Sequence, residues 1–342
     1  MEHITPDRVR LTVAEAQQLS EAVLQRTGFD TQDAHIIANH VMDAALCGYE
    51  YSGLPKILNV LEHKQLREPR RPLRVIRETP MSALYDGGNH SGMVTMYHMA
   101  QVAITKARAT GFGIAGVNNS WVSGRSAHYV EMVARAGFVG IHSVNSRPHV
   151  AAPGSKTGVT GTNPVAFGFP TQNDPFLIDM GSAAFMGTDL IFQERRGATL
   201  PEGVAMDKNG NPTRVPSEVA TIMPFGGYKG FALALAMQAL GALAGAGLGD
   251  DKTYGYLIMA ISPELMLPLE DFKQHVSDML AKVKAAPRQL GVDEIRLPGE
   301  RAQRDRARLM QEGLTIDRKI YDALLAARDG PQQQLAQLQT ER

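Results

Sequence analysis

Apolar and polar residues alternate at helical spacing over the first part of the chain, from Thr12 to about His63. Val13, Ala16 and Leu19 follow one another at steps of three, and steps of three and four continue to Met42. We therefore expect helices over this segment. Three prolines at positions 69, 72 and 80 then end the pattern, because proline interrupts helices and strand ladders.

The middle of the chain instead carries short apolar runs that are typical of buried strands. We predict a strand at residues 82–85, closed by the turn sequence Asp-Gly-Gly-Asn at 86–89. Helical spacing returns between such runs, so the centre reads as α/β. Further strands are predicted at 113–117, 139–144, 165–169, 176–179 and 256–261, helices at 92–110 and 126–136, and turns at 173–174 and 207–210.

The C-terminal part returns to amphipathic helical patterns at residues 271–286 and 300–327. We predict a helical domain built from residues 1–80 and 300–330. Residues 81–299 are predicted to form a central α/β region that binds cofactor and substrate. The glutamine-rich residues 331–342 are expected to form a flexible tail.

Composition limits the classes of partner. The chain has 342 residues, of which 44% are apolar, so it can bury a large core. Equal numbers of basic and acidic residues, 35 of each, favour neither nucleic acid nor an anionic membrane as a partner. The single cysteine, Cys47, cannot form an intrachain disulfide, and the N-terminus lacks a signal-peptide pattern, so we expect a cytoplasmic protein. The uncharged run at 231–248 is predicted to be a buried helix rather than a membrane span.

Three separated segments combine small or rigid backbone residues with polar or cationic side chains. They are GTNPVAFGFP at 161–170, PFGGYKG at 224–230 and RLPGER at 296–301. Such segments let an anionic cofactor approach the backbone closely. Lys229 stands where the uncharged helix should begin, so a cation and free N–H groups converge there, and Arg296 is our preferred phosphate ligand. These features indicate nicotinamide chemistry.

Gly111, Gly113 and Gly116 also form a G-x-G-x-x-G pattern. In a Rossmann unit this pattern follows a strand and opens a helix, whereas here the glycines end a helix and enter a strand. We therefore interpret them as a helix C-cap and a tight turn.

These segments resemble the malate/L-lactate dehydrogenase type 2 family over nearly the whole chain, as do Asp86-Gly87, LIDMGSAAFMG at 177–187 and LPEGVAMDKNGNPT at 200–213. The resemblance implies an α/β, non-Rossmann fold in which a central mixed-sheet cofactor domain is flanked by N- and C-terminal helices. It implies a homodimer. It also implies an NAD(P)H-dependent oxidoreductase that reduces a small carboxylate-bearing imine or 2-keto acid by hydride transfer.

One feature of this family is absent. Members usually carry a Ser-His-Gly triplet whose histidine works on the substrate, but residues 48–53 read Gly-Tyr-Glu-Tyr-Ser-Gly. Tyr51 or Ser52 would then manage the proton, and Asp189 matches a carboxylate with a charge-relay role. A tyrosine can donate a proton if a nearby cation lowers its pKa, and Lys56 lies one helical turn beyond Ser52.

The resemblance also implies where substrate and cofactor bind. Lys56 matches the arginine that binds the substrate carboxylate in the reductases, a role that competes with assisting Tyr51, and Thr162 would contact the substrate. Arg125 could read a 2′-phosphate, which favours NADP over NAD as the cofactor. The expected cofactor-binding residues are Val122, Ser123, Gly124, Arg125, Ser126, Asp179, Met180, Gly181, Tyr228, Lys229, Arg296, Leu297, Pro298, Gly299, Glu300 and Arg301.

The missing histidine favours an imine over a 2-keto acid as substrate, because a cyclic imine can already be protonated near neutral pH. Two alternatives stay open: a 2-hydroxy-acid dehydrogenase with a relocated proton donor, and a catalytically inactive homologue that only binds cofactor. His90 and His128 are further candidates for a displaced acid, and we interpret both as structural. The ten histidines show no metal-ligand spacing, so no metal site is predicted.

Overall fold

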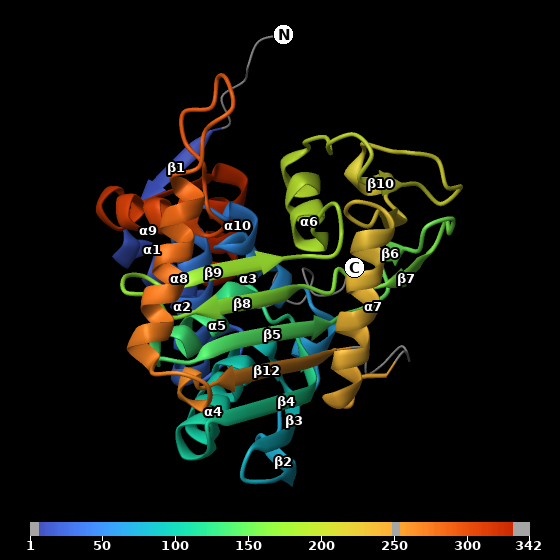
Figure 1. The fold of residues 1–342 in the computed structure, drawn as a ribbon. Coiled ribbons are helices and arrows are strands. Elements are labelled where there is room, and N and C mark those ends of the chain that lie inside the picture. Colours follow the sequence, from blue (N-terminus) through green and yellow to red (C-terminus); the bar gives the residue numbers. More distant parts are fainter. Residues whose placement is uncertain (1–6, 248–253, 331–342) are drawn as a thin grey trace.

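The computed structural model describes residues 7–247 and 254–330, and a seven-stranded mixed sheet forms its centre (Figure 1). Within this sheet β3 and β4 pair in parallel and the other neighbours pair antiparallel. A Rossmann unit needs consecutive parallel strands, so the predicted non-Rossmann α/β fold is confirmed. In spatial order the strands are β2 (Arg74–Glu78), β3 (Ser82–Ser91), β4 (Phe112–Trp121), β12 (Gly255–Ile261), β5 (Val139–Asn145), β8 (Val165–Phe169) and β9 (Phe176–Met180).

Helices cover both faces of this sheet (Figure 1). Helices α4 (Gly92–Thr110) and α5 (Ser126–Arg135) pack on one face. A Cβ at Gly113 would fall 2.0 Å from the carbonyl oxygen of Ala103, so only glycine allows this approach of α4. A Cβ at Gly116 would lie on the opposite face of the sheet, where it would contact Ala244 at the end of α7 (Tyr228–Leu243). Helix α7 therefore lies on the other face.

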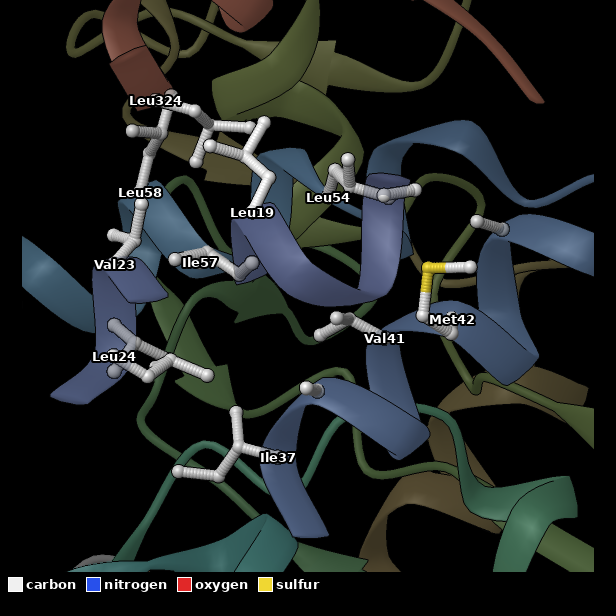
Figure 2. Packing of buried hydrophobic residues seen from close by; sticks show 14 of the residues in the cluster. Leu19, Val23, Leu24, Ile37, Val41, Met42, Leu54, Ile57, Leu58 and Leu324 are labelled. Carbon is white, nitrogen blue, oxygen red and sulfur yellow. The ribbon is translucent and has the colours of Figure 1, made fainter. Parts of the chain in front are cut away.

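The N- and C-terminal elements form a helical region beside the sheet. Helix α1 begins at a capping box, in which Thr12 Oγ1 accepts the Glu15 N–H and Glu15 accepts the Thr12 N–H. Aliphatic side chains of α1, α2, α3 and α10 then pack into one core (Figure 2). Its elements are β1 (Arg8–Leu11), α1 (Val13–Arg26), α2 (Thr31–Leu46), α3 (Pro55–Leu61), β13 (Leu314–Asp317) and α10 (Arg318–Asp329).

The predicted continuous helix at 300–327 is wrong in its middle. Helix α9 (Glu300–Glu312) ends at Gly313, whose φ is +82°. A Cβ there would lie 2.4 Å from the Leu11 carbonyl oxygen, and β13 then pairs antiparallel with β1. The sequence pattern missed both strands because each has only four residues and one of them pairs with the far end of the chain.

The predicted strand at 82–85 also continues past its expected turn. Residues 86–89 form a bulge inside β3, where the pairing with β4 shifts between Asp86 and His90. Gly88 and Asn89 have φ values of +58° and +66° there, as expected of turn residues. The other predicted elements of the centre agree with the structure within a few residues, and Gly111 caps α4 in the left-handed conformation, as interpreted.

Helix α7 departs from its prediction as a buried helix. Ala234 and Met237 face the protein, but Leu235 and Leu243 are 48% and 63% exposed. None of the helices within the described residues is long and apolar enough to cross a membrane.

The predicted tail at 331–342 lies outside the described residues, and the proposed domain boundaries stay a prediction. The remaining elements are a small sheet of β10 (Ala205–Met206), β11 (Thr221–Ile222), β6 (Val150–Ala151) and β7 (Gly158–Thr160), the helices α6 (Gly187–Arg196) and α8 (Leu269–Lys284), and four 3₁₀ segments, η1 (Glu50–Ser52), η2 (Lys64–Arg67), η3 (Pro216–Glu218) and η4 (Pro263–Leu265).

Several strands of the large sheet end at one edge. Ser91 at the end of β3 pairs with Trp121 at the end of β4. Gly255, the first residue of β12, pairs with Asn145 at the end of β5, and β9 ends opposite the start of β8. The loops that follow β4, β5 and β9 therefore emerge together, and several of the predicted site residues lie at this edge.

Candidate active site

A pocket of about 160 Å³ lies at this edge, and we name it the Lys56 pocket. Two larger hollows, beside Lys64 and Arg71 and beneath β2, gather none of the predicted site residues among their lining residues. Eleven of the twelve residues that line the Lys56 pocket come from three separate segments, 49–56, 124–126 and 179–188. The lining residues are Tyr49, Tyr51, Ser52, Lys56, Gly124, Arg125, Ser126, Pro164, Asp179, Gly181, Met186 and Thr188.

The first wall comes from the stretch that lacks the family histidine. The 3₁₀ helix η1 leads through Gly53 into α3, and Pro55 stands in the first turn of that helix. A Cβ at Gly53 would lie 2.7 Å from the Cβ of Ala45, so this stretch packs tightly on α2. Ser52 and Lys56 are brought into the same pocket, as the sequence spacing predicted.

The second wall is the loop between β4 and α5. Val122 and Gly124 both have positive φ, at +56° and +74°. A Cβ at Gly124 would lie 2.1 Å from Nε2 of His40, and this same nitrogen accepts the backbone N–H of Arg125 at 2.7 Å. The loop is thus held directly against α2.

The side chain of Arg125 is also bound by α2. Its Nη1 contacts Asp43 at 2.6 Å, and its guanidinium group lies 5.4 Å from the centre of the Tyr49 ring. Arg125 is 8% exposed and belongs to the pocket wall. This placement gives no support to a role in reading a 2′-phosphate, because Asp43 already binds the guanidinium group.

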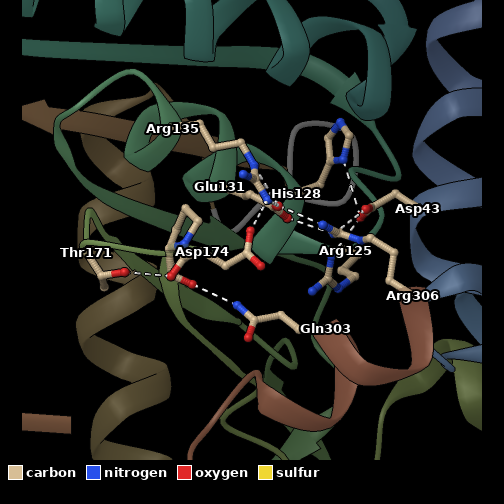
Figure 3. Close-up of polar contacts among 10 residues, drawn as sticks. Asp43, Arg125, His128, Glu131, Arg135, Thr171, Asp174, Gln303 and Arg306 are labelled. Carbon is tan, nitrogen blue, oxygen red and sulfur yellow. Dashed lines mark hydrogen bonds and ion pairs between the residues drawn. The ribbon is translucent and has the colours of Figure 1, made fainter. Parts of the chain in front are cut away.

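Asp43 lies in a wider ionic network (Figure 3). Arg306 of α9 contacts Asp43 at 2.6 Å and Glu131 of α5 at 2.7 Å, and His128 lies 3.4 Å from Asp43. Burial alone would raise the pKa of Asp43, but the hydrogen bond from His128 and the charges of Arg125 and Arg306 outweigh it and hold that pKa well below its usual range. The network fixes α2, α5 and α9 around the loop.

Asp179, at the end of β9, faces the pocket and caps α5. Its Oδ2 accepts the N–H of Ala127 at 2.8 Å, and no side chain of the N-cap residue does this. Burial raises the pKa of Asp179, although the α5 backbone N–H groups and Arg125 oppose the shift. Asp179, which we expected to bind the cofactor, therefore also has a structural role.

The pKa values of Tyr51 and Asp189 bear on the proton-handling roles that we predicted for these two residues. Burial raises the pKa of Tyr51, and the negative charges of Asp179 and Asp189 raise it further. Arg125 lowers this pKa in part, but the net shift is upward, so the condition under which we expected Tyr51 to donate a proton is not met and the phenol is neutral. Burial also raises the pKa of Asp189, whose Oδ1 accepts a hydrogen bond from Gln193 at 2.8 Å.

Lys56 is the unpaired charge of the pocket. It is 5% exposed, and its ammonium group has no hydrogen-bond or ion-pair partner among the described residues. Burial lowers the pKa of Lys56 to about 8, and the nearby positive charge of Arg195 adds to this shift. A buried cation without a partner costs stability, so its presence indicates a site for an anionic ligand.

Two predicted cofactor segments lie outside the pocket lining. Tyr228 is 70% exposed and Lys229 is exposed at the start of α7, where Gly226 and Gly227 would carry a Cβ without any contact within 4 Å. That helix N-terminus is open to an anionic group. Arg296 is exposed and is not among the residues that line the pocket, so the structure does not bring our preferred phosphate ligand to it.

The rest of the 296–301 segment is bound within the protein. Glu300 accepts the Leu297 N–H at 3.1 Å, and Gly299 packs against the carbonyl oxygen of Leu177 in β9. Arg301 reaches the pocket indirectly, because its guanidinium carbon lies 4.7 Å from the centre of the Tyr49 ring. Tyr49 thus contacts two arginines.

Thr162 lies behind the pocket lining. Its carbonyl oxygen accepts the Ser182 N–H and hydroxyl, both at 2.9 Å, and it faces Gly181. The next residue, Asn163, has φ +31° and donates to the Ala234 carbonyl in α7 at 3.0 Å. The GTNP segment therefore joins the pocket to α7.

His90 and His128 are structural, as interpreted. His90 contacts Asp33 at 3.0 Å and the Arg71 carbonyl at 3.1 Å, and His128 belongs to the Asp43 network.

The sequence reasoning missed His40, Asp43 and Tyr49. The first two are polar residues three apart that lie among the apolar residues of the second half of α2, and this spacing was the available signal. Within residues 7–247 and 254–330 no three His, Cys, Asp or Glu side chains are grouped as metal ligands.

The mixed sheet and the pocket around the buried cation Lys56 differ from the arrangement of a Rossmann dehydrogenase. The malate/L-lactate dehydrogenase family matches this chain over residues 11–325, and the chain belongs to that family. It is 31% identical to a malate/(S)-sulfolactate dehydrogenase of Methanothermus fervidus, over 91% of this chain and 94% of that protein. It is 28% identical to an NAD(+)-dependent ureidoglycolate dehydrogenase of Escherichia coli, over 90% and 93%.

A solved Δ1-piperideine-2-carboxylate reductase of Pseudomonas syringae has the same fold. It superposes with a TM-score of 0.80 at 25% identity, covering 93% of this chain and 99% of that one. The predicted family, and with it an oxidoreductase function on small carboxylates, is confirmed.

Proposed function

We propose that this protein transfers hydride between a nicotinamide cofactor and a small carboxylate that carries an adjacent C=O or C=N group. The observation that carries this proposal is the unpaired, buried Lys56 in a pocket that also contains Ser52 and Asp179. An ammonium group in such a site binds a carboxylate strongly, because little water competes for it. The pocket volume of about 160 Å³ suits a small acid.

The pocket residues take distinct roles. Lys56 holds the substrate carboxylate, and Thr162 positions the loop behind it. Ser52, with Tyr51 as a neutral hydrogen-bond donor, contacts the reacting oxygen or nitrogen, and Asp189 supports Tyr51 electrostatically. Tyr51 and Asp189 are thus retained as site residues, but neither is proposed as the acid.

The cofactor is proposed to lie across segments 122–126, 179–181, 228–229 and 296–301. The open N-terminus of α7, with exposed Lys229 beside it, fits an anionic phosphate. When bound, the nicotinamide would supply the hydride. We favour NAD over NADP for two reasons. Asp43 already binds the guanidinium group of Arg125, which we had expected to bind the 2′-phosphate of NADP. The ureidoglycolate dehydrogenase of Escherichia coli, a relative of this chain, is an NAD(+)-dependent enzyme by name.

A cyclic imine carboxylate is the second candidate substrate. Once its nitrogen is protonated, such a molecule carries a negative carboxylate and a positive iminium. The pocket offers a cation, Lys56, and a carboxylate, Asp179, on separate segments. This arrangement complements a zwitterion and agrees with the absence of the family histidine.

Two binding and turnover measurements test the proposal. Fluorescence titration with NADH and NADPH should show binding of NADH. A panel of 2-oxo acids, 2-hydroxy acids and cyclic imine carboxylates, followed at the nicotinamide absorbance, should show turnover of at least one class. Binding of NADH without any turnover would support the alternative of an inactive homologue.

A homodimer in the cytoplasm remains part of this proposal. Helix α7 carries Lys229 as its only charged residue and exposes Leu235 and Leu243, an apolar surface that a second copy would cover. Light scattering of the wild type should give the mass of a dimer. The variant L235E should shift it toward the monomer, and a monomeric wild type would contradict the proposal.

A further inference from the structure

We propose that Lys56 is also the proton donor of the reaction, and that one ammonium group binds both the substrate carboxylate and the adjacent oxygen. This inference rests on the proposed function and adds a second role to a residue assigned there only to carboxylate binding. It makes 2-oxo acids the substrate class that depends most on Lys56.

The geometry leaves Lys56 as the available acid. His40 accepts the Arg125 N–H on Nε2, and its side chain is not among those that line the pocket. His128 is bound to Asp43. The phenol of Tyr51 is surrounded by Asp179 and Asp189, and these carboxylates oppose the loss of its proton. Of the two cationic side chains that line the pocket, Arg125 is bound by Asp43, whereas the ammonium group of Lys56 has no hydrogen-bond or ion-pair partner among the described residues.

A single ammonium group can serve both roles. It has three N–H donors, and in a 2-oxo acid one carboxylate oxygen and the keto oxygen can lie on the same side of the molecule. As hydride reaches the carbonyl carbon, the C=O π pair moves onto the oxygen. One N–H bond of Lys56 breaks, its electron pair stays on Nζ, and the proton forms the new hydroxyl. The neutral amine then regains a proton from solvent.

The surroundings of Lys56 suit an acid that works near neutral pH. Burial and then Arg195 of α6 lower the pKa of Lys56 to about 8, so the group is still mostly protonated at pH 7. The other titratable groups around it are Tyr51 of η1, Asp179 of β9, Arg125 of the loop, and the buried His40 and His63, on which Lys56 acts electrostatically.

The substitution K56R separates the two roles. Arginine keeps the charge and can bind a carboxylate through two N–H groups, but it does not release a proton near neutral pH. K56R should keep a KM for the 2-oxo acid within a few fold of wild type and lose about 10²- to 10⁴-fold in kcat. The matched control is K106R, because Lys106 is also buried but pairs with Glu78 at 2.9 Å outside the pocket.

The pH profile adds an independent readout. Because the donor must be protonated, wild-type kcat for reduction should fall as pH rises through about 8, and K56R should lack this decline. For a cyclic imine that is already protonated on nitrogen, the K56R loss should be much smaller. A K56R enzyme with wild-type kcat and the wild-type pH profile would overturn the proposal.

A second variant covers the case in which K56R does not fold, as judged by circular dichroism. K56A removes the amine, and added primary alkylamines should restore part of its 2-oxo acid reduction, whereas tetramethylammonium, which has no N–H, should not. Equal effects of both cations would overturn the proposal. If the wild type binds NADH but reduces no substrate, both the proposed function and the role of Lys56 as proton donor fail. If the wild type reduces a substrate but the Lys56 variants do not give the results expected here, only the role of Lys56 as proton donor fails.

Discussion

Arg125 and Asp43 are 82 residues apart in the chain and form an ion pair of 2.6 Å beneath the pocket wall. Their side chains are 7% and 14% exposed, and Arg306 approaches the same carboxylate from α9. This contact fixes the β4–α5 loop to the N-terminal helices. The shape of the pocket therefore depends on residues that do not line it.

The substitution D43N should destabilise the protein strongly. It removes the negative charge between Arg125 and Arg306 and leaves the buried guanidinium group of Arg125 without its ion-pair partner, while the partly exposed Arg306 keeps Glu131. Loss of one member of a buried pair costs about 3–5 kcal/mol in the free energy of unfolding. Urea denaturation measures this, with D174N as the control, since Asp174 is exposed and pairs with Arg135 at the surface. Equal small losses in both variants would contradict the structural role of the network.

The substitution G124A should remove activity through the position of His40. Alanine at 124 would bring a Cβ to 2.1 Å from Nε2 of His40, in addition to the cost of a positive φ. G203A isolates that backbone cost, because Gly203 has φ +78° and no atom within 4 Å of its Cβ position. G203A should lose roughly 1–2 kcal/mol of stability and keep its activity. If G124A kept wild-type kinetics as well, the loop would not be held as described.

Lys56 should cost the folded protein stability. Its pKa is about 8 in the folded state against an ordinary 10.5, so between these values the unfolded chain binds a proton that the native protein does not. Stability should therefore rise with pH from about 8 to 10.5, and below 8 the cost is fully present. K56M should be more stable than wild type at pH 7, by about 2–3 kcal/mol, and lack this pH dependence. Denaturation series at several pH values would reveal it, and a K56M less stable than wild type would argue against an unpaired buried cation.

Trp121 should report the protonation of His63. The two rings stack with centroids 4.5 Å apart, and burial, aided by Arg147, lowers the pKa of His63 to about 4. The unfolded chain binds this proton from about pH 6.5, so the contribution of His63 to stability is lost as pH falls from 6.5 toward 4. Trp121 is the only tryptophan, and its fluorescence should fall with a midpoint near pH 4 while the circular dichroism is still native. H63F should remove this transition; if H63F kept it, His63 would not be its source.

The sequence predicted the central elements well because their signals are local. Gly111, for example, ends α4 in the left-handed conformation that its position after a helical pattern indicated. The strands β1 and β13 were missed because their pairing, Leu11 with Leu314, joins opposite ends of the chain. No local pattern contains that information.

The candidate site was predicted in part for the same reason. Ser52 and Lys56 line the same pocket, as their short separation in the sequence predicted, although η1 ends at Ser52 and α3 begins at Pro55. The electrostatic environment depends on burial and on groups distant in the sequence. The pKa of Tyr51 is therefore raised, whereas a role as proton donor called for a nearby cation to lower it. His40 and Asp43 act through the folded loop at 124–125, and only the tertiary structure identifies that contact.

The most direct test of the central claim compares NADH oxidation by wild type and by K56M across the panel of 2-oxo acids and imine carboxylates. We predict that wild type consumes NADH with at least one of these substrates, and that K56M binds NADH within a few fold of wild type but shows no turnover. Turnover of the same substrate by K56M with an unchanged KM would show that Lys56 does not bind the carboxylate, and would contradict this account.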